Sequence, residues 1–180
     1  MFFLQMSGFP GSGKSTLANE IQKKFNCIII DHDISKTAIL ENEASSQLSA
    51  KQIGSLSYDL DFANARFYLN HGYSVILDSP CLYDEVIEKG MQAAHDFDAT
   101  YKYIECVVKD FFAVNDRLQT RQTLPSQIRS IDSEEHFIRT LQSSKYPVGV
   151  EYLKLDTLHP LETYLDEVMA YMNRVELSGE

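Results

Sequence analysis

Five short runs of apolar residues recur along the chain, and each is followed by a segment with the spacing of an amphipathic helix. Apolar runs of this length predict buried strands. The five predicted strands are Phe2–Met6, Cys27–Asp31, Tyr73–Asp78, Tyr101–Val107 and Val150–Leu155. Strands that alternate with helices indicate a parallel sheet that is covered on both faces. The pattern therefore predicts a three-layer α/β/α sandwich.

Three of the helical segments show a clear apolar stripe. In each one, apolar residues recur every three or four positions, which places them on one side of a helix. The stripes are Leu17, Ala18, Ile21 and Phe25, then Val86, Ile87, Met91 and Ala94, then Leu161, Leu165, Val168 and Met172. They support the alternation of strands and helices.

Two regions interrupt this alternation. Residues 35–72 are predicted to be helical throughout, and residues 117–149 contain Pro125, Pro147 and many Ser and Gln residues but no strand pattern. The first region has one apolar stripe, formed by Leu56, Leu60, Ala63 and Phe67. Insertions of this kind often form lids or substrate-binding walls. We interpret 35–72 as a substrate-side insertion and 117–149 as a lid, within one domain of residues 1–180 that no repeat or linker divides.

Composition narrows the class of protein. Hydrophobic residues make up 44% of the 180 residues and charged residues 23%, which is ordinary for a globular protein and argues against disorder. No apolar run reaches the ~18 residues of a membrane span, and the first residues lack the charged start of a signal peptide. The three cysteines, Cys27, Cys81 and Cys106, form no C-x-x-C pair, so we expect them to be buried and reduced. These features predict a soluble cytoplasmic protein.

The charge balance bears on the choice of partner. Sixteen basic residues and 26 acidic residues give a net charge of −10. Nonspecific binding to nucleic acids or to acidic membranes depends on excess positive charge. We therefore expect neither a nucleic acid nor a membrane as a partner, whereas the sequence leaves open whether the protein is a monomer or a homodimer.

The strongest motif spans residues 8–16, GFPGSGKST, and fits G-x-x-x-x-G-K-[ST] at every fixed position. It follows an apolar strand and begins a helix, which is the context that this phosphate-binding loop requires. Glycines let backbone N–H groups surround phosphate oxygens, Lys14 reaches the β- and γ-phosphates, and the Ser15 hydroxyl is offered to Mg²⁺. The candidate nucleotide-binding residues are Gly8, Pro10, Gly11, Ser12, Gly13, Lys14, Ser15 and Thr16. The motif predicts a site for ATP and Mg²⁺.

Other segments help to choose among classes of P-loop protein. The chain has no N-K-x-D or D-x-x-G motif of a GTPase and no internal L-S-G-G-Q motif of a transporter ATPase. It is also short for a motor protein or for a ring-forming AAA+ subunit. Small kinases remain as the best match.

The second predicted strand ends in a polar segment, Asp31-His32-Asp33, followed by Lys36. Ligands of open α/β sheets bind at the carboxyl ends of the strands, so Asp33 is a candidate base for a substrate hydroxyl and Lys36 a candidate substrate contact. Asp33 could instead be an ordinary helix N-cap, and the two roles are compatible. Asp31 is the next candidate base, and His32 is expected to be an exposed neighbour.

Two further signals concern phosphate and metal. The third strand ends in Asp78, a pattern typical of the Walker B carboxylate that holds Mg²⁺, usually through water. Arg117, Arg121 and Arg129 lie in residues 117–131, which contain no Asp or Glu. Guanidinium groups stabilise the charge on a γ-phosphoryl group in the transition state, and Arg117 and Arg121 are spaced to share one helix face. The alternative is a solvated helix face.

Taken together, these motifs resemble those of the P-loop kinases grouped with zeta toxins and polynucleotide 5′-hydroxyl kinases. The resemblance covers about residues 2–121 and 150–174. It implies a five-stranded parallel sheet in the order 2-3-1-4-5, with ATP and Mg²⁺ at the P-loop.

The resemblance also implies roles for single residues. Asp33 and Lys36 match a pair that holds the base and a substrate-side cation, and Arg117 and Arg121 match a lid motif, R-x-x-x-R, that contacts the nucleotide. Many relatives carry an arginine soon after the third strand. Residues 79–90 contain no arginine and only Lys89, so the substrate of any one relative does not transfer to this chain.

The sequence thus predicts a kinase that moves the γ-phosphoryl group of ATP onto a hydroxyl of a small molecule. Lys14, Asp33, Arg117 and Arg121 are the predicted catalytic residues. A nucleoside or nucleotide kinase is a near alternative, and a switch protein that hydrolyses ATP slowly and acts through a partner is a more distant one. A switch needs no base at Asp33. The acceptor remains unnamed, although residues 35–72 and 122–149 are expected to form its walls.

Overall fold

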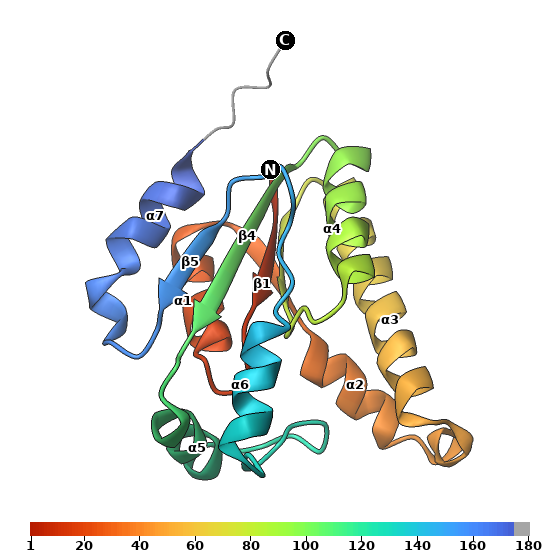
Figure 1. Ribbon diagram of the computed structural model, residues 1–180. Coiled ribbons are helices and arrows are strands. Elements are labelled where there is room, and N and C mark those ends of the chain that lie inside the picture. Colours follow the sequence, from red (N-terminus) through yellow and green to blue (C-terminus); the bar gives the residue numbers. More distant parts are fainter. Residues whose placement is uncertain (175–180) are drawn as a thin grey trace.

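The computed structural model describes residues 1–174 and contains a five-stranded parallel sheet in the order β2-β3-β1-β4-β5 (Figure 1). The strands are β1 (Phe2–Ser7), β2 (Cys27–Asp31), β3 (Ser74–Asp78), β4 (Thr100–Val107) and β5 (Leu153–Asp156). The predicted three-layer sandwich and its strand order are confirmed. The largest difference concerns β5, which begins at Leu153 rather than Val150 because its pairing with β4 starts at the Ile104–Leu153 register.

Helices occupy both faces of the sheet and its carboxyl edge (Figure 1). They are α1 (Lys14–Lys24), α2 (His32–Leu40), α3 (Ala50–Asn70), α4 (Asp84–Asp96), α5 (Phe111–Thr120), α6 (Glu134–Gln142) and α7 (Leu165–Asn173), with short 3₁₀ helices η1 (Glu43–Gln47) and η2 (Leu161–Thr163). Among residues 1–174, no helix is both long enough and apolar enough to cross a membrane.

Two apolar clusters lie on opposite faces of the sheet, because successive strand residues point to opposite sides. Leu4 and Met6 of β1 pack with α1 and α7, whereas Phe3 packs with α3 and α4. Burial on both faces explains why the strands are continuous apolar runs. As predicted, Cys27, Cys81 and Cys106 are buried in these clusters as free thiols.

The region 35–72 is mostly helical, but the predicted apolar stripe of α3 faces away from the sheet. Leu56, Leu60 and Phe67 are 46%, 45% and 57% exposed. The buried face of α3 consists of Ile53, Ser57, Tyr58, Asp61, Phe62, Ala65 and Leu69. Two polar residues on this face have partners inside the protein, since the Ser57 hydroxyl donates to the Ile53 carbonyl and Asp61 contacts a histidine of α2.

A third apolar cluster joins α5 and α6 to the loop that follows β1. Its buried members are Phe9, Val108, Val114, Leu118, Ile131 and Phe137. The Phe9 and Phe137 rings meet edge to face, with centroids 5.0 Å apart. No strand is found between residues 117 and 149, all of which the structure describes, as the sequence predicted. The proposed lid region is thus packed directly on the phosphate-binding loop.

Candidate active site

Most of the predicted site residues lie at the carboxyl edge of the sheet. Asp31 at the end of β2 is in register with Asp78 at the end of β3, and Asp78 is in register with Met6 of β1. The motif of residues 8–16 leaves β1 at the same edge. In open α/β sheets this edge is where ligands bind.

At the start of the phosphate-binding loop, the backbone conformation and its close surroundings allow only glycine. Gly8 has a φ of 138°, and a Cβ there would lie 2.2 Å from the carbonyl oxygen of Cys106. Gly13 has a φ of 90° and directly precedes α1, so the first N–H groups of the helix open toward the loop. The Lys14 ammonium lies across the loop and donates to the Gly8 and Phe9 carbonyls at 2.8 and 3.2 Å. The loop thus combines free N–H groups with a cation, as a phosphate site requires.

Asp78 is buried beside Lys14 and Ser15. Burial raises the pKa of Asp78, while the Lys14 ammonium and a hydrogen bond from Ser15 partly offset that rise. Mg²⁺ at nucleotide sites keeps several waters and takes only one or two protein oxygens in addition to phosphates. The Ser15 hydroxyl and the Asp78 carboxylate fit that requirement. Among residues 1–174 there is no cluster of three His, Cys, Asp or Glu side chains that could hold a metal ion alone.

Asp31 and Asp33 have different surroundings at the start of α2. The N-cap of α2 is Asp31, whose carboxylate accepts the Asp33 N–H at 2.8 Å, so the alternative reading of Asp33 as the cap is wrong. The Asp33 carboxylate instead accepts from the Gln127 amide at 2.8 Å and from the Ser126 hydroxyl at 3.3 Å. Both partners belong to the segment between α5 and α6. Asp33 therefore connects α2 to the proposed lid.

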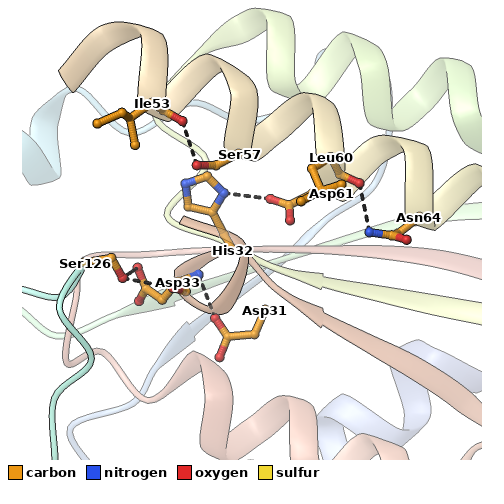
Figure 2. A network of polar contacts seen from close by, with 9 residues as sticks. All are labelled: Asp31, His32, Asp33, Ile53, Ser57, Leu60, Asp61, Asn64 and Ser126. Atoms are coloured by element: carbon orange, nitrogen blue, oxygen red, sulfur yellow. Dashed lines mark hydrogen bonds and ion pairs between the residues drawn. The ribbon is translucent and has the colours of Figure 1, made fainter. Parts of the chain in front are cut away.

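The prediction that His32 is exposed is wrong. His32 is only 4% exposed, and its Nδ1 lies 2.7 Å from Oδ2 of the fully buried Asp61. The imidazole also stacks on the Tyr58 ring, with centroids 4.0 Å apart. Figure 2 shows His32 directed toward α3 and Asp33 directed toward Ser126. No local pattern signals this contact, because Asp61 is 29 residues away in the sequence.

The three arginines of residues 117–131 occupy different positions. Arg117 lies in α5 and donates to the carbonyls of Thr157, Gly11 and Leu158, at 2.9 to 3.4 Å. Arg121 follows the end of α5 with extended backbone. The prediction that Arg117 and Arg121 share one helix face is therefore wrong. The Arg121 side chain donates to the Ile128 carbonyl. Arg129 is exposed and lines neither cavity described below.

Two adjoining cavities lie at this edge. The larger, of about 780 Å³, is lined by the phosphate-binding loop and by Asp31, Asp33, Asp78, Arg117 and Arg121. The smaller, of about 200 Å³, is lined by Lys36 together with Phe9, Leu82, Ile128, Thr140 and Leu141. Pro10, His32, Asp33, Pro80, Arg121 and Gln127 line both. Asp33 therefore lies at the boundary between the two cavities, and Lys36 lies in the smaller one.

Several residues of the site were not predicted from the sequence. Ser126 and Gln127 reach Asp33 from a segment without regular structure, and Thr157 donates to the Ser12 carbonyl at 2.6 Å from a position after β5. His159 and Tyr164 also line the larger cavity. Proximity of strand ends could have indicated Thr157, because it directly follows β5 at the ligand-binding edge.

Known structures share this architecture over nearly the full chain. A provisionally named kinase from Chloroflexus aurantiacus has a TM-score of 0.67 and 18% identity, with coverage of 94% of this chain and 97% of that one. A gluconokinase from Sinorhizobium meliloti has a TM-score of 0.62 and 17% identity, covering 95% and 91%. The APS kinase of Mycobacterium tuberculosis, solved with AMPPNP and APS, has a TM-score of 0.61 and 12% identity, covering 96% and 98%. At these identities the likeness establishes the fold.

Sequence comparison is consistent with this fold. No curated protein sequence matches the chain at a significant level. The profile of one family, described as an AAA domain, matches residues 4–141, a stretch that includes most of β1, the phosphate-binding loop, Asp33, Asp78 and both cavity arginines. The chain therefore belongs to the AAA domain family.

Proposed function

We propose that the protein is an ATP-dependent phosphotransferase that moves the γ-phosphoryl group of ATP onto a hydroxyl of a small molecule. The observation that supports this most directly is the position of Asp33 at the boundary of the two cavities. ATP would occupy the larger cavity and the acceptor the smaller one. A carboxylate between them suits a base that accepts the proton of the acceptor hydroxyl. Within the AAA domain family, the motifs favour the kinases grouped with zeta toxins and polynucleotide 5′-hydroxyl kinases.

The phosphate side of the reaction is assigned to residues of the larger cavity. Lys14 would contact the β- and γ-phosphates, and Arg117 and Arg121 would neutralise the charge that gathers on the transferred group. When bound, Mg²⁺ would help to neutralise this charge, with Ser15 and Asp78 as its protein-side contacts. Arg117 and Lys14 are already held near the loop by carbonyl contacts, which a phosphate would replace.

The acceptor side favours a small molecule. The smaller cavity measures about 200 Å³, below the size range of pockets that bury drug-sized ligands. Its lining mixes apolar side chains with Lys36, Ser126 and Thr140, which suits a hydroxylated molecule. Two of the similar structures carry names of kinases that act on small molecules, a gluconokinase and an APS kinase.

A screen of hydroxyl-bearing metabolites tests this function. ADP release is measured with each candidate and compared with the rate without acceptor, using the wild type and Lys14→Ala. We expect at least one metabolite to raise ADP release in the wild type and none to do so in the variant. ADP release that no acceptor stimulates would instead support the switch protein.

A further inference from the structure

A buried ion-pair-like contact lies directly beside the proposed base, and the reaction as described gives it no role. It joins His32, the first residue of α2, to Asp61 in the middle of α3. The Asp61 side chain is fully buried and that of His32 is 6% exposed. Groups of this kind are seldom buried without a specific reason, because each loses its hydration.

Asp61 depends on His32 for its pairing. The Oδ2 atom of Asp61 lies 2.7 Å from Nδ1 of His32, and Oδ1 has no hydrogen-bond partner among residues 1–174. Tyr58 covers one face of the imidazole. The hydrogen bond to Asp61 therefore fixes the direction in which the imidazole points, and the stacking on Tyr58 fixes the plane of the ring.

Few apolar side chains of α2 are buried, so polar contacts contribute much of what fixes its orientation. Its buried residues are His32 and Thr37; among its larger apolar side chains, Ile34 and Leu40 are 61% and 37% exposed and Ile39 is half-buried. A helix usually takes its orientation from an apolar face that packs on the core. In α2 the fully buried positions are polar, so we infer that their hydrogen bonds contribute to setting the rotation of the helix.

The direction of Asp33 follows from that of His32. Successive residues of an α-helix are rotated by about 100° around its axis. His32 and Asp33 accordingly point in different directions, one toward Asp61 of α3 and the other toward Ser126 (Figure 2). Both residues line the two cavities, and the Asp33 carboxylate lies on the side of the segment between α5 and α6. A rotation of the first turn of α2 would move the Asp33 carboxylate away from the boundary of the cavities.

We propose that His32 and Asp61 are positioning residues that fix the first turn of α2 and thereby aim the Asp33 carboxylate at the acceptor hydroxyl. The proposal rests on the proposed function, in which Asp33 accepts the proton. It assigns no contact with substrate to either residue.

Two amide substitutions at one position test the direction of the contact. In His32→Asn the side-chain nitrogen takes the place of Nδ1, from which it can donate to Asp61, whereas in His32→Gln it takes the place of Nε2. We expect kcat to stay within about fivefold of the wild type in His32→Asn and to fall roughly 10- to 100-fold in His32→Gln, with KM for ATP nearly unchanged in both. Ser57→Ala, a buried change on the same face of α3, is the matched control and should transfer at the wild-type rate.

A double variant separates positioning from stability. His32→Leu and Asp61→Leu should each lower the melting temperature. His32→Leu leaves the Asp61 carboxylate buried without a partner and removes the ring that packs on Tyr58, and Asp61→Leu leaves the buried imidazole without its partner. The double variant should regain part of that loss, since no unpaired charge remains, while its kcat stays low. Equal kcat in His32→Asn and His32→Gln, or a wild-type kcat in the double variant, would overturn the proposal.

A readout without catalysis distinguishes this proposal from the proposed function. The ¹³C signal of the Asp33 carboxyl, assigned with Asp33→Asn, is recorded in the unliganded proteins. We expect it to keep its wild-type shift in His32→Asn and to move or broaden in His32→Gln. An unmoved signal in both overturns the positioning role. A signal that moves as expected supports it even if no acceptor is found, in which case only the proposed function fails.

Discussion

Two carboxylates at the strand ends, Asp31 and Asp78, have raised pKa values because both are removed from solvent. Asp31 is half-buried and close to Asp78, and burial followed by repulsion from Asp78 raises the pKa of Asp31 from 3.8 to about 6. Asp78 is more deeply buried but has Lys14 and Ser15 beside it. Ionising Asp31 therefore costs more free energy than ionising an exposed carboxylate.

Asp31→Asn should stabilise the protein at neutral pH. The folded protein binds the Asp31 proton more tightly than the unfolded chain, so the stability from this group is present near pH 4 and is lost as the pH rises through about 6. Asn keeps the oxygen that accepts the Asp33 N–H and carries no charge. We expect a gain of about 1 kcal/mol near pH 7, allowing for solvent screening, and almost none near pH 4. Denaturant unfolding at both pH values measures it; an equal gain at both would contradict this account.

At the residue scale, the sequence predicted the phosphate-binding loop, Asp33 and Asp78 correctly as neighbours at one edge. These residues follow strand ends directly, so the strand pattern alone places them. The environment of His32 was not predictable in this way. Its burial depends on Asp61 and Tyr58, which reach it from α3, and no spacing rule connects those positions.

Helices α5 and α6 and the segment between them contact the rest of the protein in different ways. Both helices share an apolar cluster with Phe9, to which the end of the segment adds Ile131. The middle of the segment reaches α2 through polar contacts of Ser126 and Gln127 with Asp33 and Thr37. Polar contacts at a partly exposed surface open more readily than a packed apolar cluster. We therefore expect the middle of the segment to be the part of the proposed lid that responds to a ligand.

Residues 117–149 should exchange amide hydrogens more slowly when a non-hydrolysable ATP analogue is bound. The effect should be largest between α5 and α6, because Arg121 gains phosphate oxygens as partners in place of the Ile128 carbonyl. Hydrogen exchange by mass spectrometry measures this. Arg121→Ala should show a smaller increase in protection and a lower kcat, while Arg129→Ala, an exposed arginine of the same segment, serves as the control. Equal exchange with and without the analogue would refute a lid.

At the element scale, the sequence predicted the strands well and the exposed face of α3 poorly. Strand runs are apolar on both faces, so their burial does not depend on which neighbour covers them. In α3 the apolar stripe with Leu56 and Leu60 faces outward, while Ser57 and Asp61 are buried. Hydrogen bonds to Ile53 and His32 compensate for that burial, and a hydropathy pattern contains no information about them.

The whole molecule combines a strongly negative charge with a few cations placed at the cavities. Of its 16 basic residues, Lys14, Arg117 and Arg121 line the larger cavity and Lys36 the smaller one. A protein that binds a nucleic-acid backbone needs a continuous surface of Lys and Arg residues, and its affinity and salt dependence arise from their contacts with phosphates. The overall charge of −10 opposes that kind of contact.

The protein should therefore show no measurable binding to DNA or RNA oligomers at physiological salt. Fluorescence anisotropy with labelled 5′-hydroxyl oligonucleotides measures this directly. Micromolar binding, or transfer of the γ-phosphoryl group to an oligonucleotide end, would mean that the polynucleotide kinases of the resembled group are a better guide to the acceptor than the net charge.

At this scale the order of the five strands was predictable, because the P-loop resemblance implies it, whereas the division of the edge into two cavities was not. That division depends on Gln127, which lines both cavities and donates to Asp33 from a segment without regular structure. Under the proposed function, the identity of the acceptor depends on the smaller cavity and so on this part of the chain.

The central claim, that Asp33 serves phosphoryl transfer and not nucleotide binding, is tested most directly by Asp33→Asn. Transfer of label from γ-labelled ATP to the acceptor found in the screen is measured together with ATP affinity in both proteins. We predict that ATP affinity stays within a few-fold while transfer falls by about 10²- to 10⁴-fold, the usual contribution of general acid–base catalysis. Undiminished transfer by Asp33→Asn would contradict the account and would assign the base to another residue, with Asp31 the next to test.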